Sequence, residues 1–252
     1  MTNKNHFIPF KTDLSALVPT TLNDPFLEEP PEICIIASQE LQAYLQTHQQ
    51  TWAHNFGLTE GKTGLVKGKM FGILVVESKG KLGYLCTFSG KLRDNIYPEF
   101  FVPSLFDLAT NNNFLNKGMT ALTEIGKRIK ALEKDSSNIN SQSLINLKET
   151  RRLKSIGLQE ELFNQYQFLN TKGKTKNLLD IFKDYTKGKP PSGAGECSAP
   201  KLLHYAYKNN MKPLAIAEFW WGKATLSEGK QHKEFYPACK DKCRPILSYM
   251  LG

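Results

Sequence analysis

The sequence predicts an α/β fold, a sheet packed between helices, and three observations lead to this expectation. Residues 70–77 (MFGILVVE) are almost continuously apolar, as expected of a strand buried on both faces. Residues 82–88 (LGYLCTF) follow after the turn sequence SKGK, so the two runs predict an antiparallel hairpin. Apolar residues at helical spacing recur on both sides of this hairpin, which supplies the helices that would cover the sheet.

The composition is that of a globular protein rather than a disordered or membrane-spanning one. Of the 252 residues, 40% are hydrophobic and 23% are charged. No run of about 18 apolar residues occurs, so we expect no transmembrane helix and no membrane partner. Residues 1–11 hold no apolar stretch of the kind found in signal peptides, which predicts a cytoplasmic protein. Five cysteines are too few, and odd in number, for a disulfide scaffold.

The N-terminal region predicts an arm followed by a helix. Residues 1–37 are rich in proline and lack periodicity, which favours an extended arm laid over the domain. Ser38 is a suitable N-cap for a helix that we expect to run to about Trp52, with Leu41 on its apolar face. Cys86, in the second predicted strand, is expected to point into the core, because a free cysteine behaves as a small hydrophobe.

A helical hairpin is predicted as an insertion, residues 117–176, between the two parts of an α/β core, residues 38–116 and 177–252. Apolar residues recur with a spacing close to 3.6 in residues 118–134 and again in 144–170, and an Asn/Ser-rich break separates the two runs. The pattern indicates two antiparallel helices with a narrow apolar seam and a basic outer face.

Positive charge is concentrated in the second half of the chain. Residues 1–116 carry 9 basic and 11 acidic side chains, whereas residues 117–252 carry 24 and 13. A one-sided basic surface attracts polyanions and makes their binding salt-dependent; a lysine-rich solubilising face is the alternative. Nothing in the spacing of the basic residues encodes base recognition, so any RNA contact would be to phosphate. The residues expected to contact RNA are Lys148, Arg151, Arg152, Lys154, Lys187, Lys189 and Lys201.

Three of the five cysteines fall at the predicted N-termini of two helices with a strand, residues 214–221, between them. Cys197 precedes the first helix, and Cys239 and Cys243 precede the second, residues 245–251. A helix N-terminus lowers the pKa of a thiol, and thiolates are good zinc ligands. The trio therefore predicts a site for zinc or another thiolate-bound metal, and cysteines that are ordinary core residues are the alternative interpretation.

Two pairs of nearby residues have both a structural and a functional interpretation. His204 and His232 could each complete a four-ligand structural site, although His204 lies nearly two helical turns beyond the first cysteine and a lone histidine on an amphipathic helix is usually packed. Trp220 and Trp221 suggest stacking on unpaired bases. Neighbours on a strand face opposite sides of the sheet, so at least one of these tryptophans is expected in the core.

This layout resembles the zinc-dependent nucleoside and nucleic-acid deaminases, in which a His or Cys on one helix and a Cys pair on the next hold the metal. The order of the predicted elements also resembles the deaminase core, with the basic helical hairpin inserted. The resemblance implies a water at the fourth metal position and a carboxylate that moves protons. Ala199 stands where the deaminase pattern places its Glu, and three residues rather than two separate the Cys pair. Glu196 is therefore the catalytic candidate, with Glu218 as the second nearby carboxylate.

A second resemblance covers most of the chain. The segments LGYLCTFSGKL (82–92), GAGECSAPKLLHYAY (193–207), KPLAIAEFWWG (212–222) and FYPACKDKCRPILSYML (235–251) resemble the region that precedes the catalytic domain in long bacterial RluA-type RNA pseudouridine synthases. That catalytic domain carries a His-Arg-Leu-Asp motif, which does not occur in this sequence. The resemblance implies a role in RNA modification and argues against synthase activity of this chain by itself.

Three hypotheses follow from the sequence. The first is an accessory domain that binds rRNA or tRNA for a pseudouridine synthase catalytic domain, present in cis or in trans, with a zinc site that is structural. The second is a zinc-dependent deaminase-like enzyme acting on a base, in which zinc polarises a water and Glu196 or Glu218 shuttles protons. A plain protein-interaction module with ordinary core cysteines is a third interpretation.

Overall fold

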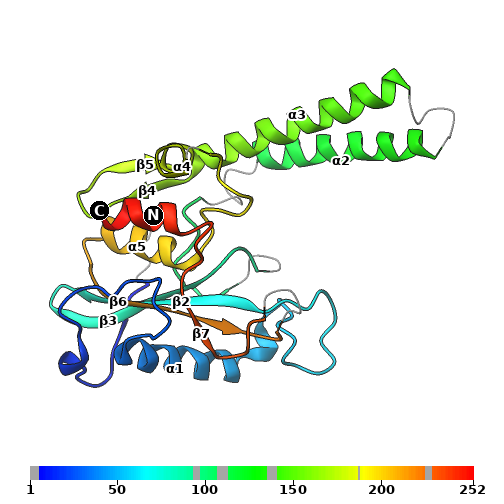
Figure 1. Cartoon of the computed structure of the whole chain (residues 1–252). Helices are drawn as coiled ribbons and strands as arrows, with labels where there is room; N and C mark the ends of the chain where they lie inside the picture. The colour runs from blue at the N-terminus through cyan, green and yellow to red at the C-terminus, as the bar shows by residue number, and fades with distance from the viewer. Residues whose placement is uncertain (1–5, 93–96, 107–112, 135–140, 187, 225–228) are drawn as a thin grey trace.

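A five-stranded antiparallel sheet forms the centre of the protein (Figure 1). The computed structural model describes residues 6–92, 97–106, 113–134, 141–186, 188–224 and 229–252. The long strands β2 and β3 form the predicted hairpin, and β6 pairs with the other edge of β2. In sheet order the strands are β1 (Ile8–Pro9), β3 (Lys81–Phe88), β2 (Lys69–Ser78), β6 (Lys212–Trp221) and β7 (Phe235–Tyr236).

Helices cover both faces of this sheet (Figure 1). The helix α1 (Glu32–Thr47) lies on one face, and α5 (Ser198–Lys208) and α6 (Arg244–Leu251) lie on the other. Strand β2 is buried on both sides, and its side chains alternate between two cores. Ile73 and Val75 belong to the core under α1, whereas Leu74 and Val76 belong to the core under α5 and α6.

A long helical hairpin projects from this body (Figure 1). It consists of α2 (Asn113–Glu133) and α3 (Gln142–Gln165), which pack mainly against each other. After α3, the chain forms the small ribbon β4 (Gln167–Leu169) and β5 (Thr175–Asn177), and then α4 (Leu178–Thr186), which packs against α6. Two short 3₁₀ turns, Ser15–Leu17 and Gln49–Thr51, complete the described elements.

The mixed fold with an antiparallel sheet agrees with the expectation from sequence, and Cys86 is fully buried as predicted. The start of the first helix was wrong. Pro31 takes the N-cap position, so the extended arm ends there rather than at residue 37, and Ser38 is buried inside the helix. Ile33, at the start of α1, packs into the sheet core, and this tertiary contact outweighs the capping preference of serine.

The second helix of the hairpin also ends earlier than the expected residue 170. Tyr166 leaves the helix, and Phe168 is fully buried in the β4 strand, so the apolar residues at this end continue as a strand rather than as a helix. None of the helices in the described part of the chain is long and apolar enough to cross a membrane.

Candidate metal centre and its cavity

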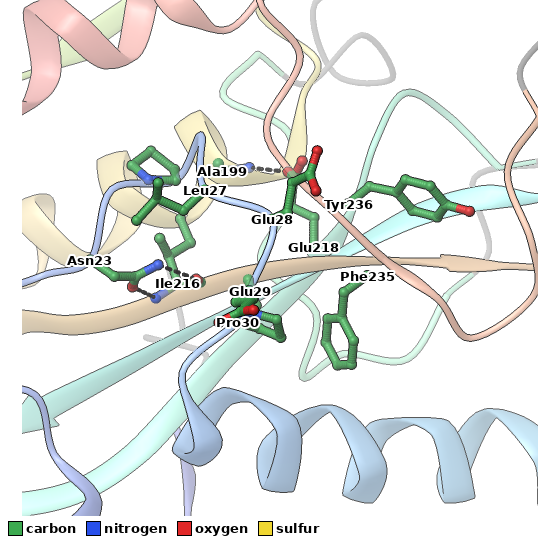
Figure 2. A pocket seen from close by; sticks show the side chains of 12 residues that line it. Asn23, Leu27, Glu28, Glu29, Pro30, Ala199, Ile216, Glu218, Phe235 and Tyr236 are labelled. Carbon is green, nitrogen blue, oxygen red and sulfur yellow. Dashed lines mark hydrogen bonds between the residues drawn. The ribbon is translucent and has the colours of Figure 1, made fainter.

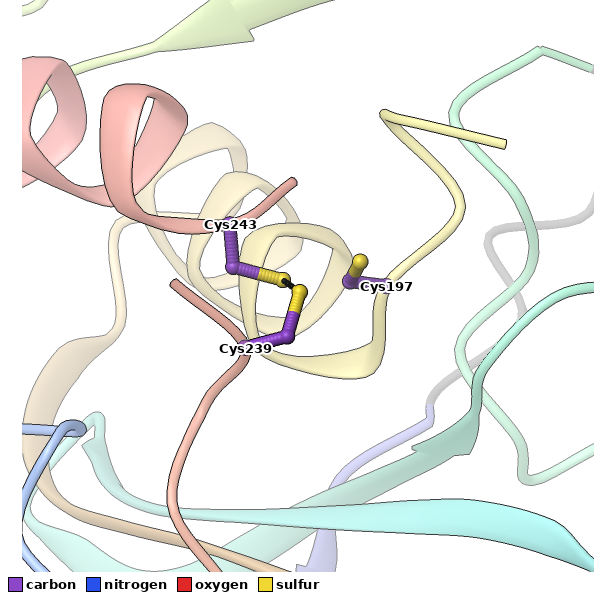
Figure 3. A group of neighbouring side chains, drawn as sticks. All are labelled: Cys197, Cys239 and Cys243. Carbon is purple, nitrogen blue, oxygen red and sulfur yellow. Dashed lines mark hydrogen bonds between the residues drawn. The ribbon is translucent and has the colours of Figure 1, made fainter. Parts of the chain in front are cut away.

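The three cysteines singled out in the sequence meet at one point (Figure 3). Cys197 is the N-cap of α5 and Cys243 is the N-cap of α6, while Cys239 lies one turn before Cys243. Their sulfur atoms all lie within 4.8 Å of one another. Sulfurs that share one tetrahedral zinc ion lie about 4 Å apart, so the trio has the dimensions of a thiolate metal site.

Local backbone contacts fix this arrangement. The N–H of Cys243 donates to the carbonyl of Cys239 at 3.3 Å, which closes the turn that carries both thiols, and Pro245 suits the first turn of α6. The Sγ atoms of Cys239 and Cys243 lie 3.3 Å apart. Hydrogen bonds from the other two thiols and from backbone N–H groups lower the pKa of Cys239, whereas hydrogen bonds within the trio raise the pKa of Cys243 and of Cys197. Cys239 is therefore the thiol that most readily becomes a thiolate.

Glycine at position 72 brings the start of α5 onto the sheet. A Cβ atom at Gly72 of β2 would lie 2.7 Å from the Cβ atom of Ser198, a distance that real Cβ atoms do not tolerate. The absence of a side chain therefore lets the first turn of α5, and with it Cys197, approach β2 closely.

The trio has no fourth protein ligand among the described residues. Neither His204 nor His232 has a ring nitrogen close enough to join the three sulfurs. At Nδ1, His204 accepts a hydrogen bond from the backbone N–H of Leu169 and His232 accepts one from Gly222. The expectation that a histidine could complete a structural site is therefore not met. All three cysteines instead line a cavity of about 460 Å³, so a bound metal would face this cavity.

Glu218 of β6 lies in the wall of the same cavity. Its side chain is 7% exposed, and one carboxylate oxygen, Oε1, accepts hydrogen bonds from the hydroxyl of Ser198 and from the backbone N–H of Ala199, the latter at 3.0 Å. Burial raises the pKa of Glu218. The carboxyl group is thus held beside the thiols and is suited to exchange a proton.

The N-terminal arm covers the other side of Glu218 (Figure 2). Asn23 of this arm is joined to Ile216 of β6 by two hydrogen bonds, of 3.0 Å and 2.8 Å. Leu27 and Glu28 follow along the arm and line a small pocket with Ala199 and Glu218. The arm therefore helps to keep this carboxylate away from bulk water.

Glu196, the catalytic candidate from the sequence, is held differently. Its Oε1 accepts a hydrogen bond from the hydroxyl of Tyr166, and its Oε2 accepts one from Ser104 at 3.2 Å. The Nζ atom of Lys201 lies 3.9 Å from Oε2. Both oxygens of Glu196 are thus engaged by the protein, which leaves Glu218 as the carboxylate better placed for proton transfer.

The basic residues expected to contact RNA are dispersed. Lys201 is 1% exposed and donates to the carbonyl of Phe88 at 2.6 Å, so the prediction that it contacts RNA at the surface was wrong. Lys187 lies outside the described residues. Arg151 and Lys154 are exposed on α3. Three others are exposed and form ion pairs: Lys148 with Glu133, Arg152 with Glu149, and Lys189 with Glu160.

Sequence analysis missed the lysines of the cavity wall and the tether from Tyr166. Lys67, Lys69, Lys230 and Lys242 all line the cavity. They lie on segments far apart in the sequence, and nothing in their local spacing indicates that they meet. Trp220 lines the cavity at 3% exposure and Trp221 is 1% exposed, which agrees with the expectation that at least one of the pair is in the core.

No protein-family model, curated protein or solved structure matches this chain.

Proposed function

We propose that this protein is a zinc-dependent hydrolase that removes an amino group from a nucleobase. The observation that carries the proposal is the trio Cys197, Cys239 and Cys243, which lines a cavity together with the buried carboxyl group of Glu218. Structural zinc sites have four protein ligands, whereas catalytic sites have three and keep one position for water or substrate. Three thiols with no fourth ligand among the residues described correspond to the catalytic type.

Each residue has a defined role in this reaction. The three thiolates would hold zinc, which polarises a water molecule and makes it nucleophilic at neutral pH. Glu218 would take a proton from that water while the oxygen of the water attacks the carbon that bears the amino group. It then gives the proton to the departing amine, so ammonia leaves and a carbonyl group remains. Ser198 and Ala199 orient Glu218 through their hydrogen bonds to Oε1.

The position of Glu218 supports the deaminase interpretation despite the alanine at position 199. In the deaminase pattern the proton-shuttling Glu follows the first metal ligand by two residues. In this chain Ala199 stands at that position, and its backbone N–H donates to Glu218 of β6, so a carboxylate lies beside it. The two helices that carry the thiols also lie on one face of the sheet, opposite α1 (Figure 1).

The test combines zinc analysis with an assay of ammonia release. We expect about one zinc per chain, and we expect Cys197→Ser to lower this content while the buried control Cys34→Ala retains it. With cytidine, adenosine, guanosine and their monophosphates as substrates, Glu218→Gln is expected to lower turnover by about 10²–10⁴-fold without loss of zinc. Glu196→Gln should retain far more activity. Ammonia release from none of these substrates, with zinc bound, would contradict the proposal.

A second function, RNA binding as an accessory domain of a pseudouridine synthase, is supported by the hairpin. The hairpin stands away from the body, and Arg151 and Lys154 on α3 form no ion pair with any described carboxylate. Their guanidinium and ammonium groups are therefore available to phosphates. A synthase catalytic domain in cis or in trans would then act on the bound rRNA or tRNA.

A filter-binding titration with tRNA and rRNA fragments at several salt concentrations tests this second function. Affinity should fall as salt rises, and the double variant Arg151→Ala/Lys154→Ala should weaken binding and reduce the salt slope by about 2. The control variant Lys79→Ala/Lys81→Ala, at the β2–β3 turn, should bind as the unmodified chain does. Affinity that does not respond to salt would exclude a grip on phosphates.

A further inference from the structure

We propose that the lysine-lined side of the metal cavity is a phosphate-binding subsite, so that the substrate is a nucleotide unit rather than a free base or nucleoside. The inference deepens the proposed deaminase function and rests on it for the identity of the base. The binding of phosphate to the cavity can be measured by itself.

Four lysines from three separate segments line the same cavity as the thiols. Lys67 lies just before β2 and Lys69 begins it, Lys230 precedes β7, and Lys242 precedes Cys243. Side chains that converge from three directions can surround a group that has several negatively charged oxygens. A phosphate group offers this geometry and charge, whereas a neutral nucleoside does not.

Two of the ammonium groups lie beside glycines. The Nζ atom of Lys69 lies 3.7 Å from the position that a Cβ atom would take at Gly90, and Lys69 donates to the carbonyl of Lys91 at 2.7 Å. The Nζ atom of Lys242 lies 3.6 Å from the corresponding position at Gly193, whose φ of +77° also favours glycine. Both ammonium groups thus lie against bare backbone at the cavity wall.

Aromatic rings hold a third ammonium group at this wall. The Nζ atom of Lys230 lies 5.3 Å from the centre of the Trp220 ring and 5.7 Å from that of Tyr236. A Cβ atom at Gly68 would lie 2.6 Å from the indole ring of Trp220, so the glycine makes room for this ring against β2. The ring and the cation therefore lie together at the edge of the cavity.

The four lysines have no closely paired carboxylate among the described residues. None of them forms an ion pair with one, although Glu196 and Glu218 line the same cavity. Burial, together with the charges of Lys67 and Lys201, lowers the pKa of Lys69 to about 8. An anion in the cavity would relieve this repulsion.

The size of the cavity favours a ligand larger than phosphate alone. Its volume is about 460 Å³, within the range of pockets that take small organic molecules. The thiols, Glu218 and the four lysines all line this one cavity. A nucleotide can place its base near the thiols while its phosphate contacts the lysines.

The test compares the binding of each ribonucleoside and its 5′-monophosphate to the zinc-loaded full chain by isothermal titration calorimetry. At least one monophosphate is expected to bind about 10-fold or more tightly than its nucleoside, since hydrogen bonds to charged groups contribute this much. The variants Lys69→Met and Lys230→Met should remove most of this difference. Lys212→Met, on the opposite end of β6, should preserve it.

Further measurements distinguish an RNA strand from a free nucleotide as the source of the phosphate. They also distinguish failure of the phosphate subsite from failure of the deaminase function. Tighter binding of a single-stranded tetranucleotide than of the mononucleotide assigns the phosphate to an RNA strand, and the reverse order assigns it to a free nucleotide. Equal affinity for every nucleoside and its monophosphate would overturn the inference, as would unchanged binding in the Lys230→Met variant, whose half-buried loop position tolerates the change. Phosphate-dependent binding without ammonia release would refute only the deaminase function.

Discussion

In α5, which carries the first thiol of the candidate metal centre, the side chains of Leu202, Leu203 and Ala206 are completely buried. In the helical hairpin α2–α3, three buried apolar side chains, Leu122, Leu144 and Phe163, are distributed over two much longer helices. Met119, Ile145 and Leu153 are each more than half exposed there. The same chain thus contains a helix fixed by a dense core and a pair of helices that hold mainly to each other.

This difference separates the two proposed functions in physical terms. Chemistry at a metal requires ligands held within a fraction of an ångström, and packed side chains supply this rigidity. Contacts to phosphates on a surface depend on charge and tolerate movement of the helix. The densely packed region therefore suits catalysis, and the projecting hairpin suits a salt-dependent grip on RNA.

The largest difference in the free energy of unfolding is expected between two leucine-to-alanine substitutions, one in α5 and one in α3. Leu203→Ala removes a fully buried side chain from α5 and should lower the free energy of unfolding by about 2–5 kcal/mol. Leu153→Ala removes a side chain that is 55% exposed on α3 and should have little effect, because alanine is the better helix former. Urea unfolding of both variants measures the difference. Equal losses of stability would show that the hairpin is packed as firmly as the body.

Two glycine-to-alanine substitutions are expected to change the free energy of unfolding by smaller amounts and in opposite directions. Gly72→Ala inserts a methyl group 2.7 Å from Ser198, which should cost about 1–3 kcal/mol and weaken zinc binding by displacing the first turn of α5. Gly157→Ala adds a methyl group to the interior of α3, where no atom lies within 4 Å of it. It should stabilise the protein by about 0.5–1 kcal/mol.

Thermal unfolding and a competition assay with a zinc chelator check this pair. A Gly72→Ala variant that keeps both its stability and its zinc affinity would contradict the close approach of α5 to β2. Loss of zinc in the Gly157→Ala variant would contradict the independence of the hairpin from the metal centre.

The parts of the fold that the sequence predicted are those with strong local signals. The apolar run of β2 and the turn after it predicted the hairpin, and the cysteines at two helix starts predicted the meeting of three thiols. The start of α1 was misjudged because the choice between Ser38 and Pro31 depends on the packing of Ile33 against the sheet. The capping preferences of single residues carry no information about this packing.

The rest of the candidate site depends on side chains brought together over long separations. Glu218 was one of two carboxylates considered, and its hydrogen bond with Ala199 depends on the pairing of β6 beside β2. Lys69 and Lys242 are separated by most of the chain but line one cavity. Lys201 was expected to contact RNA because it belongs to the lysine-rich second half of the chain, and its burial beside Phe88 and Glu196 has no local signal.

The smallest effect on the candidate metal centre is expected from shortening the hairpin. Residues 121–155 can be replaced by a short Gly-Asn loop, which keeps the close crossing of Gly118 and Leu158, where a Cβ atom on the glycine would lie 2.5 Å from the leucine. Because α2 and α3 contact mainly each other, zinc content and nucleotide binding should be unchanged. RNA affinity should fall, since Arg151 and Lys154 are removed.

Elemental analysis and filter binding, with the full chain measured in parallel, test both statements. Loss of zinc in the shortened chain would show that the hairpin supports the metal centre, and full RNA affinity would move the RNA contacts to the body.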